Sequence, residues 1–536
     1  MNPTGGSVPA GPEREDALDA PLGDVPASSV PRGDDATPAE TTDTLHIVIP
    51  GPPPDDQPML PLGRDARAGL GTLGQDAPNA STPRRIGLIA GLMLGVVAVA
   101  FESFGITTVM PAVVEDLGHV RLYAWAFTMF MLGQVFAIVV AGRLCDRLGA
   151  LLPLCAGMGL FAIGLASAAL SPSMHIFICA RLIQGLGGGA LNLALMVVVA
   201  EAFDERARPK LMTAFSFCYL LPAFVGPLVA GYIAERLSWH WVFWSVMPFV
   251  VVASALGAAP LARLYRNRAP AQSEHEPVPL WAAGLAAGGV ALIQASGQDL
   301  ADRGVGVLTV VLAILGVGGV VVALPRLMPP RIWRLGRGLP AVMGARGALA
   351  GAFFAAQSFI TMCLSETRGM ELQNAGLALT VGALGWALGS LLQTQSWLKL
   401  RRDQIIALGA VAVTIGLALM ALLAGWRNCP LIVLGLGLLL TGFGMGMASA
   451  GTSLATMTLS APERIGHNTS SLQVADNLAC AFIGGIAGTL FAGLHHWHSA
   501  EFTFAWLFGV VSALALMGVF LSLRIGPVRN TTANVG

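Results

Sequence analysis

The chain has 536 residues, of which 54% are hydrophobic and 12% charged, with a mean hydropathy of +0.68. This exceeds the apolar content that one globular core uses, so the composition excludes an ordinary soluble protein and indicates a polytopic membrane protein. The formal net charge of zero is a cancellation, because residues 1–83 hold 13 acids and 4 arginines while the remainder holds 27 basic and 18 acidic residues.

Residues 1–83 form an acidic segment that contains 15 of the 33 prolines. Such a segment has too little apolar surface to offset the entropic cost of ordering it, so we expect a disordered cytoplasmic tail. No apolar stretch follows a basic start within it, and we therefore do not expect a signal peptide.

Fourteen apolar stretches of about 20 residues, the length that crosses the hydrocarbon of a bilayer, follow this tail. The sequence therefore predicts an all-α membrane protein with fourteen transmembrane helices. Their expected spans are residues 86–109, 122–142, 151–170, 175–200, 211–234, 241–262, 280–297, 304–325, 341–364, 373–394, 404–424, 430–458, 469–493 and 502–524.

The basic residues alternate between the two sides of this arrangement. From Arg84 onward, the loops and flanks on the side where the first helix begins carry 20 Lys or Arg, and the opposite loops carry 5. Cytoplasmic loops are enriched in Lys and Arg, so both termini are predicted to be cytoplasmic in a plasma (inner) membrane.

The first helix contains the neighbours Phe101 and Glu102, followed by Thr107, Thr108 and a proline at its expected end, Pro111. An ionisable group inside a membrane is costly, and such groups mark ion pathways or binding sites. Glu102 is therefore the first candidate for a proton carrier.

A charged run at residues 142–149 follows the second helix and contains Gly142, Asp146, Arg147 and Gly149. Glycines permit a tight reversal between antiparallel helices, and an aspartate there can face an arginine or a positive helix end. We expect this run to be a short loop that controls switching between conformations.

The fourth helix carries Arg181 and Gln184, one turn apart on the same face, followed by a run of glycines at 185–189. The arginine must face the interior of the helix bundle, and the glycines permit close contact between helices. The fifth helix ends with Gly226, Pro227 and Gly231, which favour a smooth, bent face along which a neighbouring helix can slide.

These runs, together with Trp239, Trp241 and Phe243 at the start of the sixth helix, resemble motifs of the major facilitator superfamily. Their order is similar to that of its fourteen-helix drug:proton antiporter branch. The sequence departs from the family pattern at Glu102, where an aspartate is usual, at His240, where an arginine is usual, and after Gly149, where a basic pair is missing.

The resemblance implies two six-helix halves, at 84–262 and 339–525. Between them lies a linker, 263–338, with two extra helices, and residues 526–536 form a C-terminal tail. It also implies a central cavity between the halves, alternating access, and export of an amphipathic small molecule. No nucleotide-binding pattern occurs, and we expect neither enzymatic activity nor a cofactor nor a nucleic-acid partner, with the proton gradient supplying the energy.

Four charged residues remain inside the expected spans once helix ends are set aside: Glu102, Arg181, Arg346 and Asp476. Counting helix rise places Glu102 and Arg181 in the outer half of the membrane, and Arg346 and Asp476 in the inner half. Depth therefore predicts two acid–arginine pairs, one in each half of the protein. An acid that either pairs with arginine or binds a proton suits a proton-coupled exporter, with Glu102 and Asp476 as the proton-coupling residues.

His495, His496 and His498 lie together in the last outer loop, but no fixed fourth ligand accompanies them, so we expect no metal site. Three other functions stay open at this point. They are an exporter of an endogenous lipid, siderophore or metabolite, a proton-coupled importer, and a non-transporting membrane scaffold that recruits a partner through its acidic tail.

Overall fold

The computed structural model describes residues 83–203, 208–265, 279–329, 332–393, 395, 397–398, 400–426, 428–461 and 464–528. The expected disordered tail, apart from Pro83, and residues 529–536 lie outside these ranges. The described residues belong to one unit, Gly71–Gly536.

Each of the fourteen expected helices is present in the described part of the chain, and all are long and apolar enough to cross a membrane. They are α2 (Pro83–Leu117), α3 (Tyr123–Leu148), α4 (Leu151–Ala169), α5 (Met174–Ala202), α6 (Arg208–Arg236), α7 (Trp239–Tyr265), α8 (Leu280–Arg303), α9 (Val307–Leu327), α10 (Leu339–Arg368), α11 (Leu372–Leu392), α12 (Arg402–Gly425), α13 (Leu431–Leu459), α14 (Ile465–Leu494) and α15 (Ala500–Leu523).

Two expectations about helix ends were wrong. Helix α2 continues through Pro111 to Leu117 instead of ending before the proline, since a transmembrane helix tolerates one missing N–H. The run at 142–148 is not a loop but the last two turns of α3. Only Gly149 and Ala150 separate α3 from α4, and Gly149, at φ 79°, closes the helix with its N–H on the carbonyl of Cys145, 2.9 Å away.

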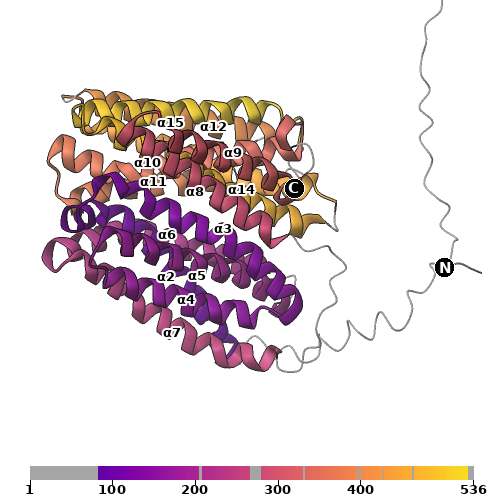
Figure 1. Ribbon diagram of the computed structural model, residues 1–536. Helices are drawn as coiled ribbons and strands as arrows, with labels where there is room; N and C mark the ends of the chain where they lie inside the picture. The colour runs from indigo at the N-terminus through magenta and orange to yellow at the C-terminus, as the bar shows by residue number, and fades with distance from the viewer. Residues whose placement is uncertain are drawn as a thin grey trace, which may run out of the picture. The chain divides into compact units, whose positions relative to one another are not determined.

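The helices of the N-terminal part, indigo to magenta, gather on one side of the bundle, and those of the C-terminal part, orange to yellow, gather on the other (Figure 1). Helices α2 to α7 pack against one another as the N-half, and α10 to α15 as the C-half. The extra pair, α8 and α9, packs through α8 against α3 of the N-half and α14 of the C-half. The inserted pair therefore touches both halves.

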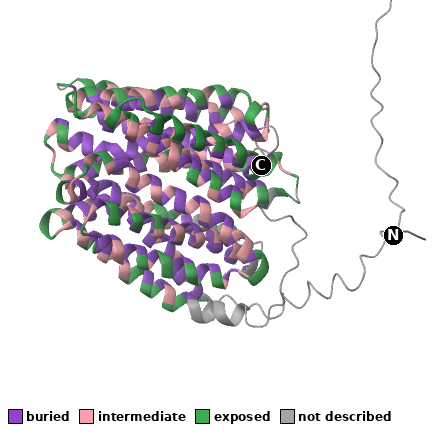
Figure 2. Ribbon diagram, in the orientation of Figure 1, coloured by how far each residue is buried: buried purple, intermediate pink, exposed green. Residues whose placement is uncertain are grey.

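Burial differs strongly between the helices (Figure 2). In α10, 89% of the most apolar window is buried, against 22% in α9. Helix α10 therefore lies at the centre of the C-half, whereas α9 presents most of its surface outward.

The two halves meet along a seam near one end of the bundle. We call the end at which α2 ends and α3 begins the distal end, and the end at which α2 begins the proximal end. Helix α3 packs against α14, and α6 packs against α11. The hydroxyl of Thr380 in α11 donates to the carbonyl of Phe224 in α6 at 3.2 Å, and the N–H of Gln373 donates to the Glu235 carboxylate at 2.9 Å.

Candidate functional site

Glu102 and Arg181 face each other inside the N-half. The Nη1 atom of Arg181 in α5 donates to Oε1 of Glu102 in α2. Each side chain is only 1% exposed. The structure thus brings together the pair that helix-rise counting predicted, and encloses it between helices.

Arg181 has further partners besides Glu102. Its Nη1 also donates to Oε1 of Gln184 at 2.8 Å, and its Nε donates to the carbonyl of Ala126 in α3 at 3.2 Å. Its guanidinium carbon lies 4.4 Å from the ring centre of Phe130 in α3. These contacts fix the arginine whatever the state of the carboxylate, because three of its partners come from α3 and α5.

Two polar atoms of this site are left over. Oε2 of Glu102 and Nε2 of Gln184 are buried without a hydrogen-bond partner among the described residues. Such a group is expensive to bury, so a proton would be stabilised on Oε2 of Glu102, and an acceptor group would be stabilised beside Nε2 of Gln184.

The glycines beside Arg181 allow the close packing that encloses it. A Cβ atom on Gly185 would meet the backbone of Phe130 in α3, and one on Gly187 would meet the backbone of Phe161 in α4. Across the same interface, a Cβ on Gly164 would collide with Gln184. Helix α5 is therefore held at backbone contact with α3 and α4, as the run 185–189 predicted.

The second predicted pair also forms. In the C-half, Nε and Nη2 of Arg346 in α10 donate to the two carboxylate oxygens of Asp476 in α14, at 3.0 and 2.8 Å. The side chains are 13% and 21% exposed, so this bidentate pair is less enclosed than the first. The contact is confirmed, whereas the coupling role of either pair stays a prediction.

The glycines and proline of α6 face two neighbours, α2 within the N-half and α11 across the seam. Gly226 faces Phe101 and Phe104 of α2, within the N-half. Further along, Gly231 faces the backbone of Gln373 in α11, and the carbonyl of Pro227 approaches Gly376. A side chain on Gly231 would keep the halves apart, because the added Cβ would lie 2.7 Å from a backbone atom of Gln373.

The charged run at 142–148 forms the last two turns of α3, at its proximal end. Gly142 faces Leu193 of α5, while Asp146 and Arg147 are exposed in the last turn. Asp146 does interact with another group. This agrees with its position, since an acid at a helix C-terminus is disfavoured by the helix dipole and gains from another partner.

Several contacts that join the halves were not foreseen. The Tyr123 hydroxyl in α3 donates to the carbonyl of Ser358 in α10 at 2.6 Å. Within the C-half, His495 lies beside Glu366, a contact that was not foreseen either. Partners such as Tyr123 and Ser358 are more than 200 positions apart, and nothing local in the sequence links them.

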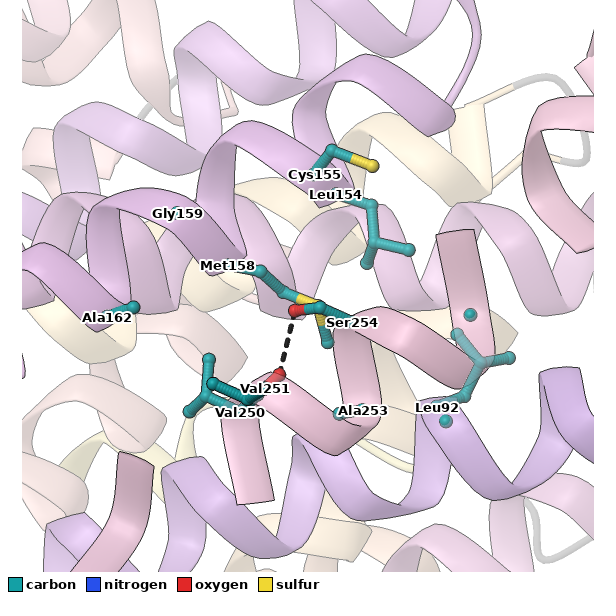
Figure 3. A pocket seen from close by; sticks show the side chains of 12 residues that line it. Leu92, Leu154, Cys155, Met158, Gly159, Ala162, Val250, Val251, Ala253 and Ser254 are labelled. Atoms are coloured by element: carbon teal, nitrogen blue, oxygen red, sulfur yellow. Dashed lines mark hydrogen bonds between the residues drawn. The ribbon is translucent and has the colours of Figure 1, made fainter. Parts of the chain in front are cut away.

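A cavity of about 290 Å³ opens within the N-half, between α2, α4 and α7 (Figure 3). Its lining is apolar apart from Cys155 and Ser254, and the Ser254 hydroxyl donates to the carbonyl of Val250 at 2.7 Å. The cavity includes neither Glu102 nor Arg181, and it lies inside one half instead of between the two.

In the part of the chain that the structure describes, no group of three His, Cys, Asp or Glu side chains is placed to hold a metal ion. His495, His496 and His498 instead make ring contacts with Phe491, Trp497 and Phe502, respectively.

Comparison with known proteins agrees with this arrangement. An uncharacterised MFS-type transporter of Mycobacterium tuberculosis is 25% identical, over 77% of this chain and 60% of its own length. This chain thus spans less than two thirds of that relative. The multidrug transporter protein MdtP of Bacillus subtilis is 31% identical over 32% of this chain and 31% of its own length. The multidrug efflux pump SdrM of Staphylococcus aureus is 31% identical over 31% of this chain and 38% of its own length.

Solved structures share the fold. A crystal structure of the peptide transporter POT superposes with a TM-score of 0.60 at 17% identity, over 82% of this chain and 95% of that chain. The sequence profile of the Major Facilitator Superfamily matches residues 92–484, which span both halves and the inserted pair. The chain therefore belongs to the major facilitator superfamily of membrane transporters.

Proposed function

We propose that this transporter is a proton-coupled exporter of amphipathic small molecules that works by alternating access. The observation that carries the proposal is the enclosed pair of Glu102 and Arg181, each 1% exposed, in the centre of the N-half. We further propose that the proximal end faces the cytoplasm of a plasma membrane, in line with the 20 to 5 distribution of basic residues.

The surroundings of Arg181 suit a carboxyl group that exchanges partners. A buried charge left alone costs about 3–5 kcal/mol, so Glu102 cannot leave its arginine unless something neutralises it. A proton does so. Arg181 meanwhile keeps its bonds to Gln184 and the Ala126 carbonyl, so releasing Glu102 does not leave the guanidinium unpartnered.

A route from this pair to the seam runs through α2 and α6. Phe101, the neighbour of Glu102, faces Gly226 of α6, and on the same helix Gly231 faces Gln373 of the C-half. A small shift of α2 that follows neutralisation of Glu102 would therefore reach the contact between the halves. The bent, small-residue face of α6 favours sliding over separation.

The pair of Arg346 and Asp476 supplies a second candidate in the C-half. Its partial exposure allows solution to reach the carboxylate of Asp476 more easily than that of Glu102. We assign it a supporting role in proton coupling, because it is the remaining acid–arginine pair among the four charges inside the expected spans.

We infer the direction of transport and the kind of cargo from similarity to other transporters. The direction is export, and the cargo is a drug-like molecule. The run at Gly226, Pro227 and Gly231 resembles an element of antiporters, and two relatives named as multidrug proteins match about a third of this chain. An endogenous lipid, siderophore or metabolite would suit the same machine.

The test is transport by purified protein in proteoliposomes. With an imposed pH gradient, a fluorescent amphipathic cation should accumulate against its own gradient, and collapsing the pH gradient should stop it. No gradient-driven movement of any amphipathic cargo, with the protein correctly inserted, would contradict proton-driven export and favour the scaffold. Accumulation only of a lipid or metabolite from the host membrane would support the proposed transport mechanism but with an endogenous substrate.

A further inference from the structure

An aromatic cluster closes the seam at the distal end. Tyr123 of α3 is fully buried, and its ring centre lies 5.0 Å from that of Phe359 in α10 and 6.2 Å from that of Phe491 in α14. Phe359 and Phe491 are 5.3 Å apart. We call Tyr123, Phe359 and Phe491 the seam cluster. Because its tyrosine belongs to the N-half and its phenylalanines to the C-half, the halves cannot part here without breaking it.

A titratable pair is attached to the seam cluster. The ring of His495 stacks on Phe491, with centres 4.6 Å apart at an interplanar angle of 26°. Its Nδ1 lies 3.7 Å from Oε2 of Glu366 in α10. The two side chains are 31% and 28% exposed, so solution at the distal end can reach the pair.

The pair does not form a hydrogen bond in this conformation. A separation of 3.7 Å exceeds the 2.7–3.2 Å of an ordinary N–H···O bond, and Nδ1 of His495 is buried with no hydrogen-bond partner among the described residues. To donate to Glu366, the ring must move by about 0.5–1 Å from the position in which it stacks on Phe491.

Other titratable groups lie near the pair in the described part of the chain. Tyr123 of α3 and Cys363 of α10 lie within electrostatic reach of Glu366, and His496 within reach of His495. Arg368 of α10 and Glu501 of α15 lie within reach of Cys363. Arg368 donates to the carbonyls of Leu423 and Trp426, at 3.3 and 3.0 Å. Of these groups, Tyr123 also belongs to the seam cluster.

We propose that His495 and Glu366 form a second proton-binding site, which faces the outer solution and loosens the seam cluster when His495 is protonated. The charged ring moves toward Glu366, shifts in its stack on Phe491, and weakens the contact that holds the distal end shut. This proposal rests on the proposed function for the assignment of the distal end to the outside.

The direction of the pH effect on opening follows from the surroundings of the His495 ring. Burial lowers the pKa of His495 in this closed conformation, and the neighbouring His496 adds to the effect. In a state where the ring is exposed, the pKa returns toward the ordinary value of about 6.5. The open state therefore binds the proton more tightly, so outer acidity favours opening below about pH 6.5, and the effect fades as the pH rises above that value.

The experiment measures opening of the distal end without transport. Spin labels at Leu237→Cys, after α6, and Leu431→Cys, at the start of α13, report the distance between the halves in nanodiscs, with the native cysteines replaced. All samples carry Glu102→Gln, so that Glu102 cannot contribute. Lowering the pH from 7.5 to 5.5 should raise the ratio of open to closed protein by about threefold or more.

Substitutions test whether His495 and Glu366 cause this pH response. His495→Gln and His495→Phe should both abolish it, the second while keeping an aromatic ring beside Phe491. Glu366→Gln should move the midpoint to lower pH, because the carboxylate that attracts the charged ring is gone. His498→Gln, a neighbour that contacts Phe502 instead of the seam cluster, is the control and should leave the response unchanged.

The outcomes separate this site from the proposed function. An unchanged pH response in both His495 variants, or none in the protein with His495 intact, overturns the site. If the site is real but proton-driven export is not, the response depends on His495 while the protein with Glu102 intact shows no gradient-driven transport.

Discussion

Arg181 of α5 donates a hydrogen bond to Glu102 of α2 while the same guanidinium bonds to Gln184 and to the carbonyl of Ala126 in α3. One side chain thus ties three helices of the N-half together, and only the bond to Glu102 depends on a charge that a proton can remove. A neutral Glu102 would free α2 from this arrangement and leave α3 and α5 joined.

Glu102→Gln should abolish proton-driven efflux and leave the abundance of the inserted protein near normal. Glutamine has nearly the same shape and keeps a hydrogen-bond acceptor for Arg181, but it cannot carry a proton. The measurement is uphill transport in proteoliposomes with an imposed pH gradient. Glu115→Gln, an exposed acid on the same helix, is the matched control and should transport normally. Uphill transport at the parental rate by the Glu102 variant would remove Glu102 from the coupling mechanism.

The sequence predicted the helices and the acid–arginine pairs because both follow from simple physical costs. A bilayer demands about 20 apolar residues in each helix, and it forces a buried arginine to find an acid at similar depth. That reasoning reached Arg181 with Glu102 and Arg346 with Asp476.

The charged run at 142–148 misled the prediction, because charged residues and Gly142 read as a loop. Helix α3 in fact carries them past the apolar stretch, and only the positive φ of Gly149 ends it. The sequence could not predict the contacts at and beside the seam for another reason. Tyr123 with Ser358 and Glu366 with His495 are contacts between distant segments whose residue types carry no local pattern.

Gly231→Ala should weaken closure of the distal end. Its added Cβ would lie 2.7 Å from a backbone atom of Gln373, and such overpacking costs about 1–3 kcal/mol, or roughly a 5–150-fold shift toward the open state. The distance between labels at Leu237→Cys and Leu431→Cys should lengthen, and transport should slow. Gly484→Ala in α14, where nothing lies within 4 Å of the added atom, is the control. Equal behaviour of the two variants would mean that α6 and α11 do not form the moving contact.

Asp146→Asn should slow the switch between conformations while leaving insertion intact. Asp146 lies in the last turn of α3, where its charge opposes the helix dipole. We propose that its interaction with another group stabilises one of the closed states. Turnover and label distances should both change, and Arg147→Gln, at the next position, shows whether any charge change in this turn has the same effect. If the Asp146 variant keeps the parental turnover and label distances, the run at 142–148 serves only as the end of helix α3.

Arg181→Ala should shift the pH profile of efflux to higher pH, by about one unit or more, because a carboxyl group without its cation holds a proton more tightly. Arg346→Ala should not produce this shift, since its partner is Asp476 in the other half.

Removing Arg181 also leaves an enclosed acid unpaired, so the variant is compared with Arg181→Lys, which keeps the positive charge but loses the fork that reaches Glu102, Gln184 and Ala126 together. Lysine should restore most of the parental pH profile even where it restores only part of the rate, because the profile depends on the charge and the rate on the geometry. The profiles of the three variants are measured side by side in proteoliposomes. Equal shifts in the Arg181→Ala and Arg346→Ala variants would show that proton binding is not governed by the pair in the N-half.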